Sequence, residues 1–308
     1  MYEIVKLTDD NIKDLVSLYE NAFGKKTSEA YIKQKFSTEF TNHKNLGFIA
    51  YHESGEAAAF YGVLPCFTYV NGGKVLVAQS GHTMTHKKHR RAKLFIKLAN
   101  HTFEYCKQKG FKAVYGFPNI YSYPSFIKKL NWNHFDDYHA FTPRVKCFPW
   151  IKVNNIFPPA KSLQKAVQKI TLAFLKNSKA FKNSIQTGKH IAIEHDEPYF
   201  NYKKFENNYC KIIGGDNIWF KFNAMYLLVG DYESARDLEY THKRIKKLAF
   251  LLGVPHVRYQ VSSNTDLYNF CIESEFEKGN TYPIAGIALD ESFPIDKMKF
   301  TLADFDTF

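Results

Sequence analysis

Six cationic side chains lie between residues 87 and 97, with no acidic residue among them. The stretch THKKHRRAKLFIKLANHTFEYCKQKG, residues 85–110, passes from this cluster directly into the apolar spacing of an amphipathic helix. Because a helix N-terminus presents free backbone N–H groups and a partial positive charge, it binds phosphate well. The pattern predicts a site for a compact anion. The alternative is an ordinary solvated helix start.

Histidines surround the same cluster. His82 lies in the predicted strand KVLVAQSGHTMTH, and a side chain that titrates near neutral pH can accept a proton from a substrate. A structural histidine in a strand is the alternative. His86, His89 and His101 are spaced by three and twelve residues, and no acid or cysteine lies near the first two, so we predict no metal site.

Composition and length indicate a globular protein with two domains. The composition, 45% hydrophobic and 23% charged, is that of a globular protein. The length of 308 residues exceeds the usual size of a domain with a single core. The five cysteines contain no CxxC pair, and no segment has the length and hydropathy of a signal peptide or a membrane span. We therefore expect a cytoplasmic protein without a disulfide framework.

The charge is unevenly distributed. The net charge is +12, and residues 1–150 hold 21 Lys and Arg against 12 Asp and Glu, which leaves +9 in the first half. A nucleic-acid surface usually spreads its cations along a groove with aromatic residues between them. A single compact cluster therefore favours a small phosphorylated ligand over a nucleic-acid partner.

The order of predicted elements in the first half is strand, helix, three antiparallel strands, helix, strand, short helix. A strand at 2–7 precedes a helix that Asp9 or Asp10 would cap, and a turn at 71–73 joins two of the antiparallel strands. Gly110 would end the long helix, after which FKAVYGFPN predicts a buried strand and SYPSFIKKLNW a short helix.

The second half repeats part of this order. The Lys- and Ala-rich segment 160–183 predicts a linking helix. Helix, glycine, strand, asparagine and an aromatic short helix occur at Gly110 to Phe126 and again at Gly253 to Phe270, which suggests a duplication. We therefore predict domains at 1–150 and 151–308.

The segments QSGHTMTHKKHRRAKLFIKLA and YGFPNIYSYPSFIKKLNW resemble the GNAT superfamily of acyl-CoA-dependent N-acyltransferases. The family pattern H-P-x-Y-R-G-x-G-x-G/A corresponds here to residues 86–95, in which His86 and Arg90 fit while Lys93 and Phe95 replace two glycines. A Leu-Phe ending is similar to that of one bacterial branch. The resemblance implies an α+β fold with a mixed, mostly antiparallel sheet flanked by helices, as two GNAT-like domains in tandem with the second degenerate.

The resemblance also implies a site for acetyl-CoA or coenzyme A as co-substrate, with no metal. Strand residues Met84 and Thr85 would pair with the pantetheine arm, and Asn119 would reach the same arm or serve instead as a turn former. The phosphates would lie at the helix start, on Arg90, Arg91, Ala92, Lys93, Leu94 and Phe95.

Two residues are the candidates for acid–base chemistry. His82 would be the base, with Gln79 and Tyr61 as alternatives for positioning the substrate. In many GNAT enzymes a tyrosine on the short helix is the acid. The matching position here is Phe126, which cannot donate a proton. Tyr123 is therefore the candidate acid, and aromatic packing is its alternative role.

These inferences predict an N-acetyltransferase that acts on an amine of a small polar acceptor. The resemblance implies an amino sugar or a nucleotide-amino sugar as that acceptor. One alternative is a GNAT-like binding or regulatory protein without catalysis, and another is a Fem-like transferase that uses aminoacyl-tRNA. Asp304 and Asp306 are candidates for an acceptor pocket, with an ordinary final strand as the alternative.

Overall fold

The computed structural model describes residues 1–179, 181–185 and 189–308. The chain forms two compact units, of which the first comprises residues 1–136 and 282–298 and the second residues 137–281 and 299–308. Each unit therefore contains segments from both ends of the sequence. The domain boundaries expected from the sequence, 1–150 and 151–308, stay a prediction.

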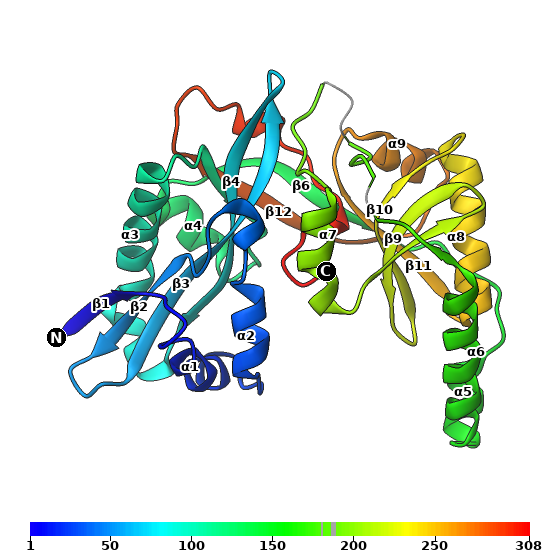
Figure 1. Cartoon of the computed structure of the whole chain (residues 1–308), viewed down its shortest axis with the longest axis horizontal. Helices are drawn as coiled ribbons and strands as arrows, with labels where there is room; N and C mark the ends of the chain where they lie inside the picture. Colours follow the sequence, from blue (N-terminus) through cyan, green and yellow to red (C-terminus); the bar gives the residue numbers. More distant parts are fainter. Residues whose placement is uncertain (180, 186–188) are drawn as a thin grey trace. The chain divides into compact units, whose positions relative to one another are not determined.

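The strands of the first unit lie in the order β1-β2-β3-β4-β5-β12, and all neighbours are antiparallel except β4 and β5 (Figure 1). These strands are β1 (Tyr2–Lys6), β2 (Gly47–His52), β3 (Ala57–Val70), β4 (Gly73–Thr85), β5 (Ala113–Gly116) and β12 (Lys278–Ala288). The helices of this unit are α1 (Asp14–Phe23), α2 (Glu29–Lys35), η1 (Glu39–Thr41), η2 (Lys87–Ala92), α3 (Leu94–Gln108), α4 (Tyr123–Leu130) and η4 (Ile295–Lys297).

Two apolar clusters form the core of the first unit, one with each pair of helices. Helices α3 and α4 pack against one cluster through side chains such as Leu98, Phe103 and Phe126. Helices α1 and α2 pack against the other through Leu15 and Ile32. A fully buried side chain of this size contributes about 1.5–3 kcal/mol, so both helix layers are firmly held on the strands.

Helix α1 begins later than predicted. The sequence places its cap at Asp9 or Asp10, whereas the helix begins at Asp14. The carboxylate of Asp9 instead accepts hydrogen bonds from Lys44 and Asn45 at 2.9 and 2.8 Å. Asp9 therefore bonds to residues distant in the sequence and does not cap α1. Helix α2 was not predicted from the sequence.

The second unit repeats the strand–helix order of the first. Its strands lie in the order β6-β11-β10-β9-β8-β7, with β10 and β11 parallel. They are β6 (Asn133–Phe141), β7 (Lys176–Asn177), β8 (Tyr209–Ile213), β9 (Asp216–Phe222), β10 (Tyr226–Glu233) and β11 (His256–Ser262). The helices are α5 (Trp150–Ile156), α6 (Ala160–Phe174), α7 (Glu197–Lys203), η3 (Lys204–Glu206), α8 (Leu238–Leu252), α9 (Asp266–Glu273) and η5 (Leu302–Asp304).

Three antiparallel strands, a 15-residue helix, a parallel strand and a short helix thus occur twice, as β2-β3-β4-α3-β5-α4 and as β8-β9-β10-α8-β11-α9. Gly110 and Gly253 follow the two long helices with φ of 83° and 67°, a conformation that glycine adopts at little cost. The predicted linking helix 160–183 is α6, which ends at Phe174. Residue 180 of the predicted segment lies outside the described residues.

Candidate acyl-CoA site

Strands β4 and β5 are paired at only two positions. Ala78 lies beside Val114 and Gln79 beside Tyr115. Strand β4 continues beyond this point to Thr85, along which it is paired with β3 on its other side. Gly116, the last residue of β5, still lies beside Ser80, where a Cβ atom on the glycine would be 3.5 Å from Ser80 Cβ. Beyond Ser80, β4 therefore runs without β5 as a partner, as an arm placed alongside it would require.

A β-bulge lies in β4 where the strands have parted. Gly81 pairs with Gly62 and Met84 with Phe60, so two residues of β4, His82 and Thr83, face one residue of β3. His82 has a φ of 54°, in the left-handed region that residues other than glycine uncommonly adopt. Bulges of this kind re-aim a side chain and are common beside active sites.

The bulge decides which way His82 points. Before it, the even-numbered residues of β4, such as Ala78, belong to the cluster packed by α3, whereas Met84 belongs to the cluster packed by α1 and α2. The ring of His82 stacks on Tyr19 of α1 with a centroid distance of 5.6 Å, and lies 6.1 Å from the ring of Phe36. The extra residue has thus turned the imidazole to the α1–α2 face of the strands.

The basic segment forms the 3₁₀ helix η2, which leads into α3. Arg90, Arg91, Ala92 and Lys93 are all exposed, and Lys93 has a φ of 54° at the junction. The first helical residues of α3 are Leu94 and Phe95, whose side chains pack into the apolar cluster under the helix. Their backbone N–H groups belong to the first turn, which has no intrahelical acceptor, so phosphate oxygens could accept from them.

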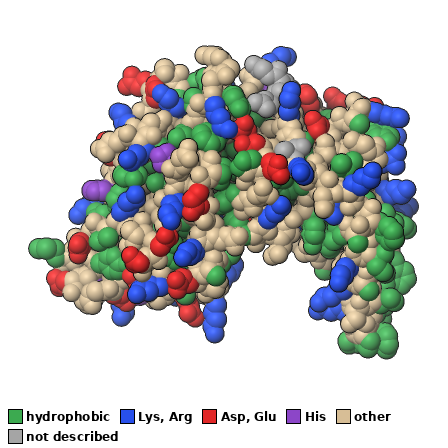
Figure 2. Space-filling view, viewed as in Figure 1, with side chains coloured by type: hydrophobic (Ala, Val, Ile, Leu, Met, Phe, Trp, Pro, Cys, Tyr) green, Lys and Arg blue, Asp and Glu red, His purple; other side chains and the backbone are tan. Residues whose placement is uncertain are grey.

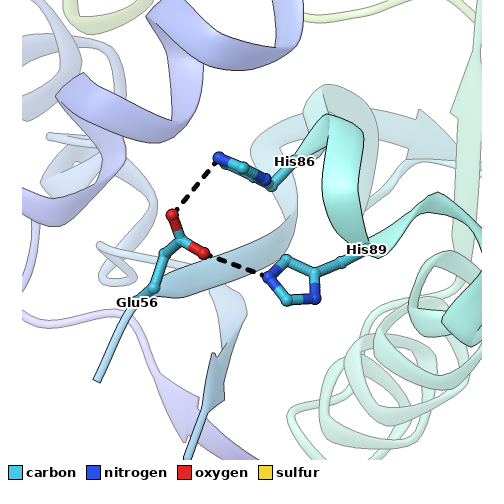
Figure 3. Close-up of side chains that lie close together, drawn as sticks. All are labelled: Glu56, His86 and His89. Carbon is cyan, nitrogen blue, oxygen red and sulfur yellow. Dashed lines mark hydrogen bonds and ion pairs between the residues drawn. The ribbon is translucent and has the colours of Figure 1, made fainter. Parts of the chain in front are cut away.

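Glu56 fixes the start of this basic segment, as Figure 3 shows. Its two carboxylate oxygens lie 3.3 Å from His86 Nε2 and 3.1 Å from His89 Nε2. His89 Nδ1 in turn lies 2.9 Å from the hydroxyl of Tyr2, and the backbone N–H of Lys87 donates to Asn21 Oδ1 at 2.9 Å. The hydrogen bond from His89 is the main cause of a lowered pKa of Glu56, which favours its carboxylate form.

The same three side chains are a possible ligand set for a metal ion. One atom from each of Glu56, His86 and His89 lies within 4.8 Å of the others, and two histidines with a carboxylate suit divalent transition metals. His86 Nδ1, however, accepts a hydrogen bond from Lys88 N at 3.3 Å, which leaves the proton on Nε2. A metal ion on Nε2 would require that proton to move and this bond to break.

Sequence reasoning missed Glu56 because the search for an acid beside the histidines was local. The predicted turn at 71–73 could have revealed Glu56 as a partner of the histidines, because β3 and β4 form a hairpin in which Ala59 pairs with Thr85. That register places residue 56 opposite the residues that follow β4. His101, the third histidine considered, is exposed on α3 and its ring packs on Phe48 at 5.2 Å.

The remaining predicted side chains take local roles in the structure. Asn119 Oδ1 accepts from the backbone N–H groups of Tyr121 and Ser122 at 2.9 and 3.0 Å, which makes it a turn former. The hydroxyl of Tyr123 lies 3.0 Å from His134 Nδ1. Met84 is buried, so only its backbone could contact an arm beside β4.

The alternatives for substrate positioning lie under the surface. Tyr61 is fully buried, its hydroxyl accepts a hydrogen bond from Ser80 Oγ at 2.8 Å, and burial raises its pKa. Gln79 is 5% exposed. Phe126, at the position expected for a catalytic tyrosine, is a core residue that packs on Trp132 at 4.4 Å.

In the second unit the corresponding gap holds the end of the chain. Strands β10 and β11 are parallel only from Tyr226 to Leu228, and β10 has one extra residue, Gly230, between Val229 and Asp231. A Cβ atom on Gly230 would lie 2.3 Å from the ring of Phe308, the last residue. Ser262 N donates to the Phe300 carbonyl at 3.0 Å, so the final segment runs beside β11.

A buried ionic triad holds this final segment. His195 Nδ1 lies 2.7 Å from Asp231 and its Nε2 2.9 Å from Asp304, and all three side chains have no exposed area. The same Asp304 accepts from Thr301 N at 2.7 Å and closes a capping box on η5. Asp304 therefore cannot line an open acceptor pocket, and that hypothesis was wrong for this residue.

Comparison with known proteins agrees with the geometry of the first unit. A model of the acetyltransferase (GNAT) domain matches residues 3–135. These residues belong to the GNAT superfamily. The end of the β4–β5 pairing and the bulge at His82 thus lie within a GNAT domain. The predicted α+β GNAT fold, a mixed sheet flanked by helices, is confirmed, and a degenerate second domain stays a prediction.

Solved GNAT structures resemble nearly the whole chain. GCN5-related N-acetyltransferases from Kribbella flavida and Anabaena variabilis superpose with TM-scores of 0.61 and 0.60, at 11% and 13% identity, over 94% of this chain and 71% and 73% of theirs. The GCN5-related N-acetyltransferase from Sphaerobacter thermophilus has a TM-score of 0.54 at 11% identity, and covers 96% of this chain and 98% of its own. At such identities the likeness shows the fold alone. No curated protein matched the sequence.

Proposed function

We propose that this protein is an acetyl-CoA-dependent N-acetyltransferase whose first unit binds the acyl-CoA and acts on an amine of a small polar acceptor. The observation that carries the proposal is the bulge in β4, which aims His82 at the α1–α2 face beside the gap between β4 and β5. Acetyl-CoA supplies the acetyl group as a thioester.

The proposed binding residues act mainly through backbone and charge. Backbone groups of Met84 and Thr85 would hold the pantetheine arm, since their side of β4 has left β5. The N–H groups of residues 92–95 and the exposed cations Arg90, Arg91 and Lys93 would hold the phosphates. Asn119 would then contribute through the turn that it stabilises.

His82 is the proposed base. The amine nitrogen forms a bond to the thioester carbon, the carbon–sulfur bond breaks, and the proton lost by the amine passes to the imidazole. The thiolate takes a proton from solvent or from Tyr123, whose hydroxyl could regain one from its partner His134. The half-buried rings of Tyr19 and Tyr31 beside His82 would suit an amino sugar, because sugar faces pack well on aromatic rings.

Titration calorimetry with coenzyme A, followed by a thiol-release assay over a panel of amines and amino sugars, tests this function. We expect binding and release of free thiol with at least one acceptor. Absence of coenzyme A binding at millimolar concentration would overturn the proposal. Binding without thiol release across the panel would favour the second candidate, a GNAT-like binding protein, for which the buried Phe126 at the expected acid position is the supporting observation.

Replacing both Arg90 and Arg91 by alanine should weaken coenzyme A binding by roughly 10- to 100-fold at low salt, because two charge-assisted contacts with phosphate are lost. The matched control is the double replacement Lys107→Ala and Lys109→Ala, which removes two exposed cations from the other end of α3. Calorimetry at two salt concentrations measures both. Equal affinities in the two double variants would show that the cluster is only a solvated helix start.

We infer that only the first unit binds acyl-CoA. In the second unit Phe308 lies against the bulge of β10, and the final segment runs beside β11 where an arm would otherwise lie. The expected stoichiometry in the calorimetric titration is therefore one coenzyme A per chain.

A further inference from the structure

Three side chains in the first unit converge on one point. Glu56 directly precedes β3, His86 caps η2, and His89 lies within η2. The Glu56 oxygens lie 3.3 Å from His86 Nε2 and 3.1 Å from His89 Nε2, and one atom from each residue lies within 4.8 Å of the other two. Figure 3 shows both rings directed at the carboxylate. Two imidazole nitrogens and a carboxylate therefore share one site.

The spacing of the two histidines places them on the same side of η2. In a 3₁₀ helix, side chains three positions apart lie one above the other, because one turn takes three residues. His86 and His89 have this spacing, and the N–H of His89 donates to the His86 carbonyl at 2.9 Å, the hydrogen bond of such a turn. The local fold of η2 thus brings two imidazoles to one carboxylate.

The backbone on both sides of the site is held by hydrogen bonds. His86 N donates to the Ala58 carbonyl at 2.9 Å, and Lys87 N donates to Asn21 Oδ1 at 2.9 Å. The segment that supplies Glu56 and the segment that supplies the histidines are therefore fixed next to each other. A binding site whose groups are already in place loses little freedom when it binds a ligand.

The two imidazoles are largely shielded from solvent, and His89 has a further partner. The side chains of His86 and His89 are 8% and 11% exposed, whereas that of Glu56 is 41% exposed. The hydroxyl of Tyr2 lies 2.9 Å from His89 Nδ1. A metal-bound histidine usually donates its other ring N–H to an oxygen atom, and this hydroxyl can accept it. The exposed side of Glu56 leaves an entry path for an ion and water.

We propose that Glu56, His86 and His89 bind a divalent transition-metal ion, for which zinc is the best match. Two imidazoles and a carboxylate are a known zinc ligand set, which a water molecule completes to a tetrahedron. With bonds of about 2.0–2.2 Å, neighbouring ligand atoms in such a site lie about 3.3–3.6 Å apart. The two distances from Glu56 to the histidines are close to this spacing.

One proton must move when His86 coordinates the ion. His86 Nδ1 accepts from Lys88 N at 3.3 Å, so the ring proton is on Nε2. On coordination the ion replaces the proton at Nε2, and Nδ1 takes a proton from water. Lys88 is exposed, so its N–H can bond to water instead. The exchange gives up one long hydrogen bond, and it leaves a tautomer of His86 that can be detected.

The charges around the site set its affinity. Glu56 contributes one negative charge, and the lowered pKa of this carboxyl, caused mainly by the hydrogen bond from His89, keeps it ionised. Lys87 and Lys88 are cations beside the site, but both are exposed, so water and salt screen their repulsion of an ion. We therefore expect zinc to bind with moderate affinity.

Titration calorimetry of the full chain with zinc chloride tests the site. No acyl-CoA is needed, so the outcome is separate from that of the proposed function. We expect one zinc ion per chain with a dissociation constant of about 10 µM or lower. The variants E56Q, H86Q and H89Q should each bind zinc at least ~10-fold more weakly, because each removes one of the three ligands.

Histidines elsewhere on the surface, some of which Figure 2 shows in purple, can also bind zinc loosely. The control H101Q removes an exposed histidine of α3 that lies outside the ligand set, and it should bind zinc like the parent protein. Circular dichroism checks that all variants keep their fold. Equal affinities in the control and the three ligand variants, or no binding up to about 100 µM zinc, would overturn the proposal and leave Glu56 as a hydrogen-bonded clamp on η2.

Nitrogen NMR of the imidazole rings supplies a test on the parent protein itself. Zinc should shift the Nε2 signals of two histidines, and one of these rings should change from the tautomer protonated at Nε2 to the one protonated at Nδ1. Zinc binding without these changes would place the ion on other residues and would contradict the assignment to Glu56, His86 and His89.

Discussion

Replacing His195 by alanine is expected to lower the free energy of unfolding by about 3–5 kcal/mol, because it leaves two carboxylates buried without a cation between them. Asp231 and Asp304 lie 2.7 and 2.9 Å from its ring nitrogens, and none of the three side chains is exposed. Ser184 Oγ and Thr301 N also donate to these carboxylates, but neither carries charge. Urea unfolding followed by circular dichroism measures the loss.

The same triad gives a definite dependence of stability on pH. Burial alone would lower the pKa of His195, but Asp304 and Asp231 outweigh it and raise the pKa to about 9. Because the folded pKa lies above the unfolded value of 6.5, the triad contributes fully below about pH 6.5 and its contribution is lost as the pH rises through about 9. The stability difference between the parent protein and His195→Ala should therefore shrink over this window.

A matched control is His256→Ala, in the same unit, whose ring is partly exposed and bonds only weakly to the Met225 carbonyl at 3.3 Å. It should change the free energy of unfolding by less than about 1 kcal/mol. A loss for His195→Ala no larger than that of the control, or a difference that grows between pH 6.5 and 9, would contradict the assignment of a charged His195.

Replacing His82 by alanine should reduce kcat by roughly 10²- to 10⁴-fold, the usual contribution of a general base. The prediction rests on the proposed function and on the bulge, which points the imidazole toward α1 and α2 beside the parting strands. Coenzyme A affinity should change little, since the phosphates are held by other residues. Thiol-release kinetics and calorimetry on the same preparation separate the two effects.

His82→Asn is the sharper variant. Asparagine tolerates the left-handed conformation that His82 adopts with a φ of 54°, so the bulge should persist while the base is lost. Turnover within about threefold of the parent in both variants would remove His82 as the base.

Much of the first unit follows from local patterns. The apolar spacing after Lys93 predicted α3, and Gly110 predicted its end. The turn at 71–73 predicted the hairpin of β3 and β4. The basic run before α3 was expected at a helix start, where it lies. Such features depend on residues a few positions apart, whose preferences are the same before and after the chain has folded.

Features that join distant residues were not predicted. Asp9 bonds to Lys44 and Asn45 rather than capping α1, and Glu56 reaches His86 and His89. Asp304, considered for an open pocket, is buried against His195. In each case the carboxylate bonds to a side chain that is distant in the sequence. Which side chain that is depends on which elements the fold brings together.

The sequence by itself determined the GNAT resemblance, the order of strands and helices, and the cationic entrance to α3, because each is written in short spacings and residue types. The tertiary structure alone decided that the bulge turns His82 to the α1–α2 face, that Phe308 lies against the bulge of β10 in the second unit, and that Leu163, Ile170 and Phe174 of α6 are exposed. The physical reason is that one inserted residue reverses which face a strand side chain occupies, and burial is settled by the neighbours that packing supplies.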